Sequence, residues 1–300
     1  MNRALVLGGG GLVGIAWELG ILTGLAQQGA DMTGPFEADG LRPEAIVGTS
    51  AGSVVGSLIG SRSLALLTEM ALEDDAASAA MESLPMLDFA LMDACFATWR
   101  DLPDDTPESL AAVGRFALKF EGVGEARYVQ GMVDAIGHDW LDDRFRCTSV
   151  NAHDGSFAVW GAASGVSLAR AVAASCAVPT IFPAVAIETE RGSARHVDGG
   201  VRSGTSIDLV AGARRILVLA PIGSWDGDAL DPAAAAAVVR ETALAEAAGS
   251  AVVTVFPDEA TNAATMYSPL TRMDPGARLP ALQHGIRQGV ALANRLHGWW

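Results

Sequence analysis

Hydrophobic residues along the chain alternate between short continuous runs and longer stretches with helical spacing. Ala4–Leu7 is an uncharged run. After a turn of glycines, apolar residues recur every three or four positions at Leu12, Ile15, Leu19, Leu22 and Ala26. The run predicts a buried strand and the recurrence predicts a helix with one apolar face. The same succession returns as a strand at Ala45–Val47 and a helix at Ala51–Gly60.

The rest of the chain continues this alternation of strands and helices. Two hairpins are predicted, because short polar turns separate 146–152 from 157–160 and 184–190 from 194–197. Further helices are predicted at 167–177, 232–248 and 279–296, and further strands at 215–220 and 251–256. Such alternation favours an α/β fold with three α/β/α layers around a central, mainly parallel sheet. We expect residues 1–300 to form a single domain.

Residues 63–125 differ from this pattern, because acidic pairs alternate with Met- and Leu-rich stretches. We interpret this segment as a helical insertion. Its apolar residues are dense enough for a candidate lid or acyl groove, since Met and Phe surfaces adapt to flexible chains; ordinary helix core is the alternative. They are Leu84, Met86, Leu87, Phe89, Leu91, Met92, Phe96 and Trp99. The acidic pairs, and Asp142-Asp143 further on, are expected at the solvated surface.

Composition excludes several classes of function. The net charge is −15, with 20 Lys and Arg against 35 Asp and Glu, which argues against nucleic-acid binding. Any membrane contact would be apolar and transient, for instance through Trp299-Trp300. Three widely spaced cysteines fit neither a disulfide framework nor a zinc site. The chain starts directly with the first strand, so we expect no signal peptide and a soluble, cytoplasmic protein.

Gly48-Thr49-Ser50-Ala51-Gly52 follows a predicted strand and begins a predicted helix. A serine on such a sharp turn projects its hydroxyl above the sheet edge, and Gly48 and Gly52 leave room for the turn and for a substrate. The helix N-terminus places N–H dipoles beside developing negative charge. This context favours a nucleophile. A glycine-rich packing turn is the alternative.

A second glycine motif lies at the first strand-to-helix turn, Gly8–Gly14. Bare backbone N–H groups in such a turn bind anions, including the oxyanion of an acyl-transfer reaction. The spacing Gly9-x-Gly11-x-x-Gly14 also fits a dinucleotide-binding turn, with Asp31 near the place of a ribose-binding acid. Both interpretations stay open at this point.

Asp198-Gly199-Gly200 follows the predicted strand that ends at Val197. An aspartate beside two glycines can approach another loop closely, although Asp-Gly is also common in ordinary turns. His196 lies on the same face of the strand as Asp198. No third ligand accompanies this pair, so we predict no metal site.

Taken together, the glycine run, the Gly-x-Ser-x-Gly turn and the later Asp-Gly-Gly resemble the patatin-like phospholipase family. Ala174-Ser175, Pro179 and Phe182-Pro183 extend the likeness. The resemblance implies a Ser–Asp dyad with Ser50 as nucleophile and Asp198 as base. It also implies an oxyanion hole from the N–H groups of Gly9, Gly10, Gly11 and Leu12. The expected reaction is hydrolysis of lipid acyl esters, of the phospholipase A type, without metal or organic cofactor.

Two positions depart from the family pattern. Val13 stands where an Arg or Lys is usual, and Ser206 stands near the place of a proline that often follows the Asp-Gly-Gly. A weakly active or non-catalytic lipid-binding homologue is therefore one alternative. A Ser–Asp–His triad with His284 or His297 is another.

Overall fold

The computed structural model describes residues 1–33, 42–59, 68, 88–120, 124–190, 192–222, 232–265 and 271–300. Within these ranges one sheet has the order β5-β6-β3-β2-β1-β7-β8, with β4 also paired to β3. Strands β3, β2, β1, β7 and β8 run parallel, whereas β4, β5 and β6 join antiparallel. The strands are β1 (Arg3–Leu7), β2 (Ala45–Gly48), β3 (Phe145–Asn151), β4 (Phe157–Gly161), β5 (Val185–Thr189), β6 (Gly192–Asp198), β7 (Arg215–Leu219) and β8 (Ala251–Val255).

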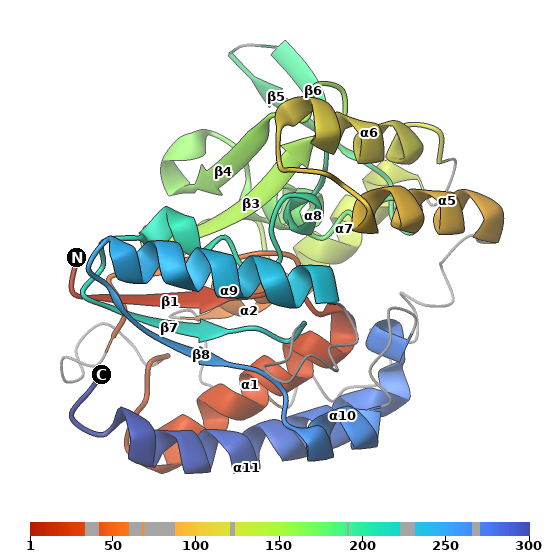
Figure 1. Cartoon of the computed structure of the whole chain (residues 1–300). Coiled ribbons are helices and arrows are strands. Elements are labelled where there is room, and N and C mark those ends of the chain that lie inside the picture. Colours follow the sequence, from red (N-terminus) through yellow and green to blue (C-terminus); the bar gives the residue numbers. More distant parts are fainter. Residues whose placement is uncertain are drawn as a thin grey trace.

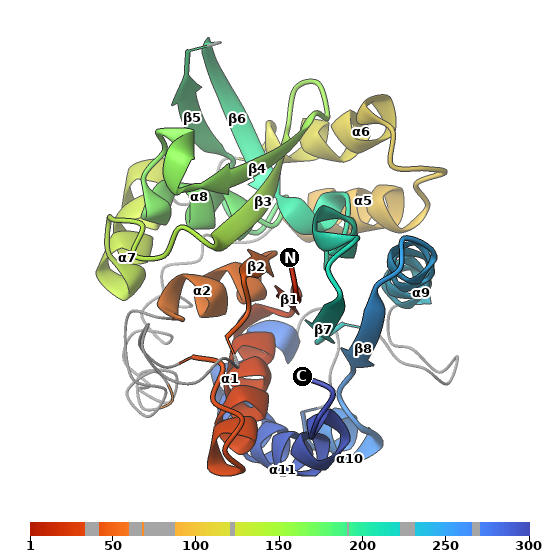
Figure 2. The same ribbon diagram turned by 90° about the vertical axis from the view of Figure 1, so that its left-hand side faces the viewer.

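Helices cover both faces of this sheet, with α9 on one face and α1 and α11 on the other (Figures 1 and 2). Alternate side chains of β1 divide between the two layers: Leu5 and Leu7 pack in the core under α1, and Ala4 and Val6 pack in the core under α9. The predicted three-layer α/β/α fold with a mainly parallel sheet is confirmed. The helices are α1 (Gly11–Gln27), α2 (Ala51–Leu58), α5 (Phe89–Arg100), α6 (Pro107–Ala117), α7 (Glu125–Ile136), α8 (Leu168–Ser175), α9 (Pro232–Ala247), α10 (Glu259–Thr265) and α11 (Arg278–Leu296).

Helices α1 and α11 touch through their backbones. A Cβ atom on Gly24 would lie 2.3 Å from the carbonyl oxygen of Ile286, and one on Gly289 would lie 2.3 Å from that of Ile21. Gly20 and Gly285 make the same kind of approach one turn away. Side chains cannot occupy these positions without moving the helices apart. The glycines therefore fix α1, and the glycine turn that precedes it, against the last helix.

In the described part of the 63–125 segment, α5 and α6 pack on the outer end of β3 and β6. Cys95, Leu110 and Val113 join Val150 and Val197 in one buried cluster. Helix α6 begins as its sequence dictates, with the Thr106 side chain accepting from the backbone N–H of Ser109 and a proline in the first turn. Residues 84–87 of the predicted apolar patch lie outside the described residues.

Two carboxyl groups lie deep in the fold. The Glu18 side chain on α1 is fully buried, and burial holds its pKa well above the usual value, although the backbone of Gly8 opposes this shift. Asp142 is also buried and pairs with Arg144, whereas Asp143 is exposed. The prediction of a solvated Asp142-Asp143 pair was therefore wrong for Asp142, because a neighbouring guanidinium compensates its burial.

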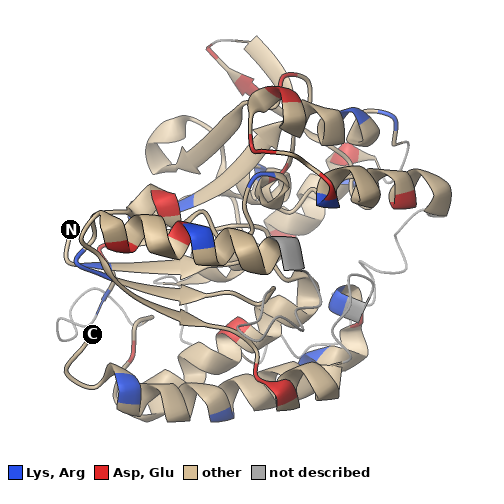
Figure 3. Cartoon of the chain, viewed as in Figure 1, with Lys and Arg blue, Asp and Glu red and all other residues tan. Residues whose placement is uncertain are grey.

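Charged residues of both signs are mixed along the chain, and no membrane-spanning helix lies in the ranges described. Figure 3 shows Lys and Arg scattered over helices and loops and interspersed with Asp and Glu. No helix among these residues is long and apolar enough to cross a bilayer. Trp300 is buried and its ring lies 5.9 Å from that of Trp299, so one of the two terminal tryptophans packs on the domain.

Candidate active site

Ser50 occupies a strained turn between β2 and α2. Its backbone has φ 52° and ψ −120°, in the positive-φ region that side chains disfavour, at a typical cost of about 1–3 kcal/mol. The flanking glycines are required by close packing. A Cβ atom on Gly48 would lie 2.5 Å from the Gly52 carbonyl oxygen, and one on Gly52 would lie 2.1 Å from that of Leu7. The turn therefore presents Ser50 at the carboxyl end of the parallel sheet, where α/β proteins usually bind ligands.

Hydrogen bonds hold the Ser50 backbone from both sides. Its N–H donates to Oγ of Ser175 at 3.0 Å. Its carbonyl accepts from Ser53, through the N–H at 2.8 Å and Oγ at 2.6 Å, and from the thiol of Cys176 at 3.2 Å. None of these bonds uses the Ser50 hydroxyl. The side chain is thus left for chemistry while the backbone is fixed.

The glycine run lies directly beside Ser50. A Cβ atom on Gly9 would be 3.4 Å from Cβ of Ser50, and Gly52 donates its N–H to the carbonyl of Gly8 at 2.9 Å. Gly11 has φ +63°, and a Cβ atom there would lie 2.7 Å from the Arg272 carbonyl oxygen. Glycine is therefore needed at Gly11 for conformation, whereas a Cβ atom at Gly9 would only make ordinary contact with Ser50.

The N–H groups of this run are not equivalent. Gly9 donates to the carbonyl of Gly204 at 2.8 Å, so its N–H is engaged in this conformation. Gly11 and Leu12 begin α1, and their N–H groups have no acceptor among the described residues. Unpaired N–H groups at a helix N-terminus form an anion-binding site. Of the four predicted oxyanion donors, Gly9 therefore has its N–H bonded to another backbone group in this conformation.

Strand register brings Asp198 to the level of Ser50. Gly48 at the end of β2 pairs with Cys147 on β3, and Ser149, two residues further along β3, pairs with Asp198 at the end of β6. Ser50 follows Gly48 by the same two residues. Because β6 runs antiparallel to β3, the carboxyl end of β6 lies at the same level of the sheet as the turn after β2. Residues 148 positions apart in the sequence therefore converge.

Asp198 sits in an environment that suits a base. The residue is 2% exposed, its Oδ1 accepts the Gly200 N–H at 2.7 Å, and Oδ2 has no hydrogen-bond partner among the described residues. Burial raises the pKa of Asp198 to about 7, opposed by the nearby Ser50 hydroxyl and the Gly200 N–H. The Ser50 hydroxyl is thus close enough to this carboxyl group to counteract the raised pKa through hydrogen bonding.

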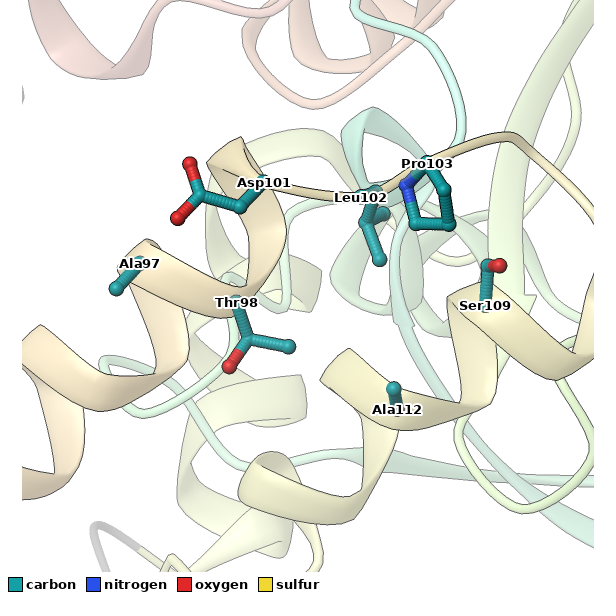
Figure 4. A pocket seen from close by; sticks show the side chains of 7 residues that line it. All are labelled: Ala97, Thr98, Asp101, Leu102, Pro103, Ser109 and Ala112. Atoms are coloured by element: carbon teal, nitrogen blue, oxygen red, sulfur yellow. The ribbon is translucent and has the colours of Figure 1, made fainter.

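An aromatic pair from α5 borders the Asp198 loop. A Cβ atom on Gly200 would lie 3.7 Å from the indole of Trp99, which stacks on Phe96 with ring centres 5.8 Å apart. A separate hollow of about 460 Å³ lies between α5 and α6 (Figure 4). None of its lining residues is a predicted site residue; they are Ala97, Thr98, Asp101, Leu102, Pro103, Ser109 and Ala112.

Asp31 and His196, on which the dinucleotide-binding and metal interpretations depended, make other contacts. Asp31 caps the turn after α1, where its Oδ1 accepts from the N–H and Oγ1 of Thr33, both at 2.8 Å. His196 is buried against Trp160 and bonded to Oγ of Ser149 through Nδ1 at 2.9 Å, and burial lowers its pKa to about 4. Among the described residues, none of the hydrogen bonds of Ser50 and Asp198 involves a histidine.

Sequence reasoning missed the contribution of Ser175 and its two successors. Ser175 and Cys176 contact the Ser50 backbone, and the carbonyl of Ala177 accepts the Asp198 N–H at 3.0 Å. The signal was present, because Ala174-Ser175 belongs to the segment that resembles the family. Nothing in the local pattern, however, indicated which distant backbone groups this segment would meet.

Comparison with known proteins identifies the family of this chain. The family model for patatin-like phospholipase matches residues 5–211. No curated protein matches the chain. Among solved structures, VipD from Legionella pneumophila is similar with a TM-score of 0.46 and 15% identity, over 98% of this chain and 67% of that one. So low a similarity adds nothing to the assignment. Because the family model spans more than half of the sequence, the chain belongs to the patatin-like phospholipase family of lipid acyl hydrolases.

Proposed function

We propose that this protein hydrolyses lipid acyl esters, of the phospholipase A type, through a dyad of Ser50 and Asp198. One observation carries the proposal: the strand register sets a buried carboxyl of raised pKa at the level of a strained serine. Serine alcohols are weak nucleophiles and need an adjacent base. A carboxyl that titrates near pH 7 can accept the serine proton and later return it.

In the first half-reaction, the Asp198 carboxylate accepts the hydroxyl proton of Ser50 while Oγ attacks the ester carbonyl carbon. The tetrahedral oxyanion collapses, the C–O bond to the alcohol breaks, and Asp198 gives its proton to the departing alkoxide. In the second, Asp198 accepts a proton from water as the water attacks the acyl-serine. Collapse releases the fatty acid and restores the Ser50 hydroxyl. No metal or organic cofactor takes part in this scheme.

We assign the oxyanion hole to the backbone N–H groups of Gly11 and Leu12, which have no acceptor among the described residues. Gly9 is not an oxyanion donor while its N–H donates to the Gly204 carbonyl. Instead, its missing side chain leaves space beside Ser50. Val13, the departure from the usual cation, is fully buried in the core behind this turn. A hydrophobic side chain there anchors the start of α1, so we expect the loop to remain formed. Loss of one oxyanion donor typically costs on the order of 10²–10³ in rate.

We further propose that residues 1–300 act as one domain, with α5 and α6 of the 63–125 insertion lying over the Asp198 loop as a lid. The backbone contact between α1 and α11 joins the last helix to the glycine turn, which supports a single domain. The position of Trp99 beside Gly200 supports a lid over the Asp198 loop.

A fluorophosphonate probe tests the proposal, because it reacts with activated serines. The wild type should be labelled at Ser50, as mapped by peptide mass spectrometry, and Ser50→Ala should abolish labelling and esterase activity. Asp198→Asn should lose activity to a similar extent, and EDTA should have no effect. Ser57→Ala, a serine of α2 with no contact to the dyad, is the control. Labelling at another serine of a folded protein, or restoration of chelated enzyme by a divalent ion, would refute the dyad.

A further inference from the structure

The end of helix α8 joins the two halves of the proposed dyad. Three consecutive residues each make one contact with it. Oγ of Ser175 accepts the Ser50 N–H at 3.0 Å, Sγ of Cys176 donates to the Ser50 carbonyl at 3.2 Å, and the carbonyl of Ala177 accepts the Asp198 N–H at 3.0 Å. Ser175 and Ala177 are fully buried. A single short segment therefore contacts both backbone groups of Ser50 and the N–H of Asp198.

These contacts address a specific physical problem. Ser50 has a positive φ, which relaxes unless surrounding interactions hold it. The amide plane before Ser50 is fixed by Ser175, and the plane after it is fixed by Ser53 and Cys176. Burial and the nearby Asp198 raise the pKa of Cys176 to about 12, so its thiol keeps the proton that it donates. The Ser50 N–H, once bonded to Ser175, is also unavailable as an oxyanion donor.

We propose that Ser175 is a positioning residue of the dyad, and that Ser175–Ala177 sets the spacing between Ser50 and Asp198. The inference rests on the proposed Ser50–Asp198 chemistry. Removing the Ser175 hydroxyl leaves the Ser50 N–H without a buried acceptor and frees the turn to rotate. A misplaced nucleophile slows the chemical step while substrate binding is retained, and a displacement of about 1 Å can cost on the order of 100-fold.

Threonine and valine have nearly the same shape, so a comparison of these two substitutions at Ser175 isolates the effect of the hydroxyl group. Ser175→Thr keeps an Oγ acceptor, whereas Ser175→Val has the same shape without one. We expect Ser175→Val and Ser175→Ala to lower kcat and the rate of fluorophosphonate labelling about 10- to 100-fold, with KM within about twofold of the wild type. Ser175→Thr should recover most of the loss relative to Ser175→Val. Should the added methyl group prevent folding of both, Ser175→Ala alone still gives the kcat and KM comparison.

Ser250→Ala is the matched control for a buried serine. Ser250 is 6% exposed, and its Oγ also accepts a backbone N–H, that of Gly212 at 3.0 Å, but it precedes β8 at the opposite end of the parallel strands from Ser50. It should lose stability without the selective fall in kcat. Equal kcat in the Thr and Val variants, or the same kcat loss in Ser250→Ala, would overturn the positioning role. Absence of labelling in the wild type would instead refute the proposed function itself.

Discussion

A Cβ atom added to Gly9 would point toward Ser50 and lie 3.4 Å from the Cβ atom of that serine. This distance is ordinary van der Waals contact, so a methyl group fits beside the nucleophile without a clash. Gly9 also lacks the positive φ that makes Gly11 intolerant of substitution. Gly9 therefore tolerates a side chain in the fold, whereas Gly11 does not.

We predict that Gly9→Ala folds normally but has a kcat/KM reduced by about tenfold or more, because the methyl group occupies space next to Oγ that the ester needs. Gly131→Ala, on α7 with no atom near its added Cβ, is the control and should keep full activity. Circular dichroism and ester hydrolysis check both. Full activity in Gly9→Ala would mean that the substrate approaches Ser50 from another side.

Activity should depend on the ionisation of Asp198. Its pKa is raised to about 7, and in the proposed mechanism only the carboxylate accepts the Ser50 proton. We therefore expect kcat/KM to fall about tenfold per pH unit below pH 7 and to level off above it. The rate of fluorophosphonate labelling should follow the same curve. An inflection near pH 4, the ordinary range of an exposed aspartate, would contradict a buried base.

Asp198→Asn should gain stability as it loses activity. The folded pKa exceeds the unfolded one, so the unfolded state of the wild type releases its proton at lower pH, and folding stability falls from about pH 4 to pH 7. The shift from 3.8 to about 7 corresponds to roughly 4 kcal/mol. Asparagine does not titrate. Urea unfolding should show a stability difference near zero at pH 4 that grows toward pH 7 and then stays constant. A constant difference across this range would contradict the prediction.

No histidine should be required for the reaction. His284→Gln and His297→Gln are expected to retain most activity, because neither histidine hydrogen-bonds the dyad. His196→Ala should lose stability through its bond to Ser149 and its contact with Trp160, while kcat changes little. In a triad, loss of histidine would lower kcat by several orders of magnitude. Such a loss in a folded His284 or His297 variant would establish a triad.

Acyl-chain preference should depend on Trp99. We expect octanoyl esters to be better substrates than acetyl esters, since the Trp99 indole offers an apolar wall beside the Asp198 loop. Trp99→Ala should reduce this preference mainly by raising KM for the longer ester. Phe89→Ala, on the same helix but 60% exposed, is the control and should leave the profile unchanged. An optimum at acetate in the wild type would mean that α5 serves only as core.

The strand–turn–helix units at β1–α1 and β2–α2 were predictable because their information is local. An apolar run, a glycine turn and a recurrence of three or four residues encode them within about 25 positions. The position of Ser50 follows from the second of these units, whereas that of Asp198, at the end of β6, follows only once the register of β2, β3 and β6 is known.

The contacts that complete the site were not predictable in this way. Ser175 contacts Ser50 across 125 positions, and the Gly9 N–H contacts Gly204 across 195 positions. The burial of Asp142 was not predicted for a different reason. Acidic pairs are usually exposed, and only the structure shows that the Arg144 guanidinium pairs with the Asp142 carboxylate. Pairings between distant groups depend on packing, which no local pattern contains.

The glycine contacts between α1 and α11 have a consequence for the order of biosynthesis. Helix α1, which begins at the glycine turn, is synthesised well before α11, and α11 follows every residue of the proposed site. Until α11 emerges from the ribosome, the backbone of α1 at Gly20 and Gly24 lacks its contacts with Leu282 and Ile286. A nascent chain can thus carry both Ser50 and Asp198 before α1 is fixed in place. We expect hydrolytic competence to arise only after α11 has packed against α1.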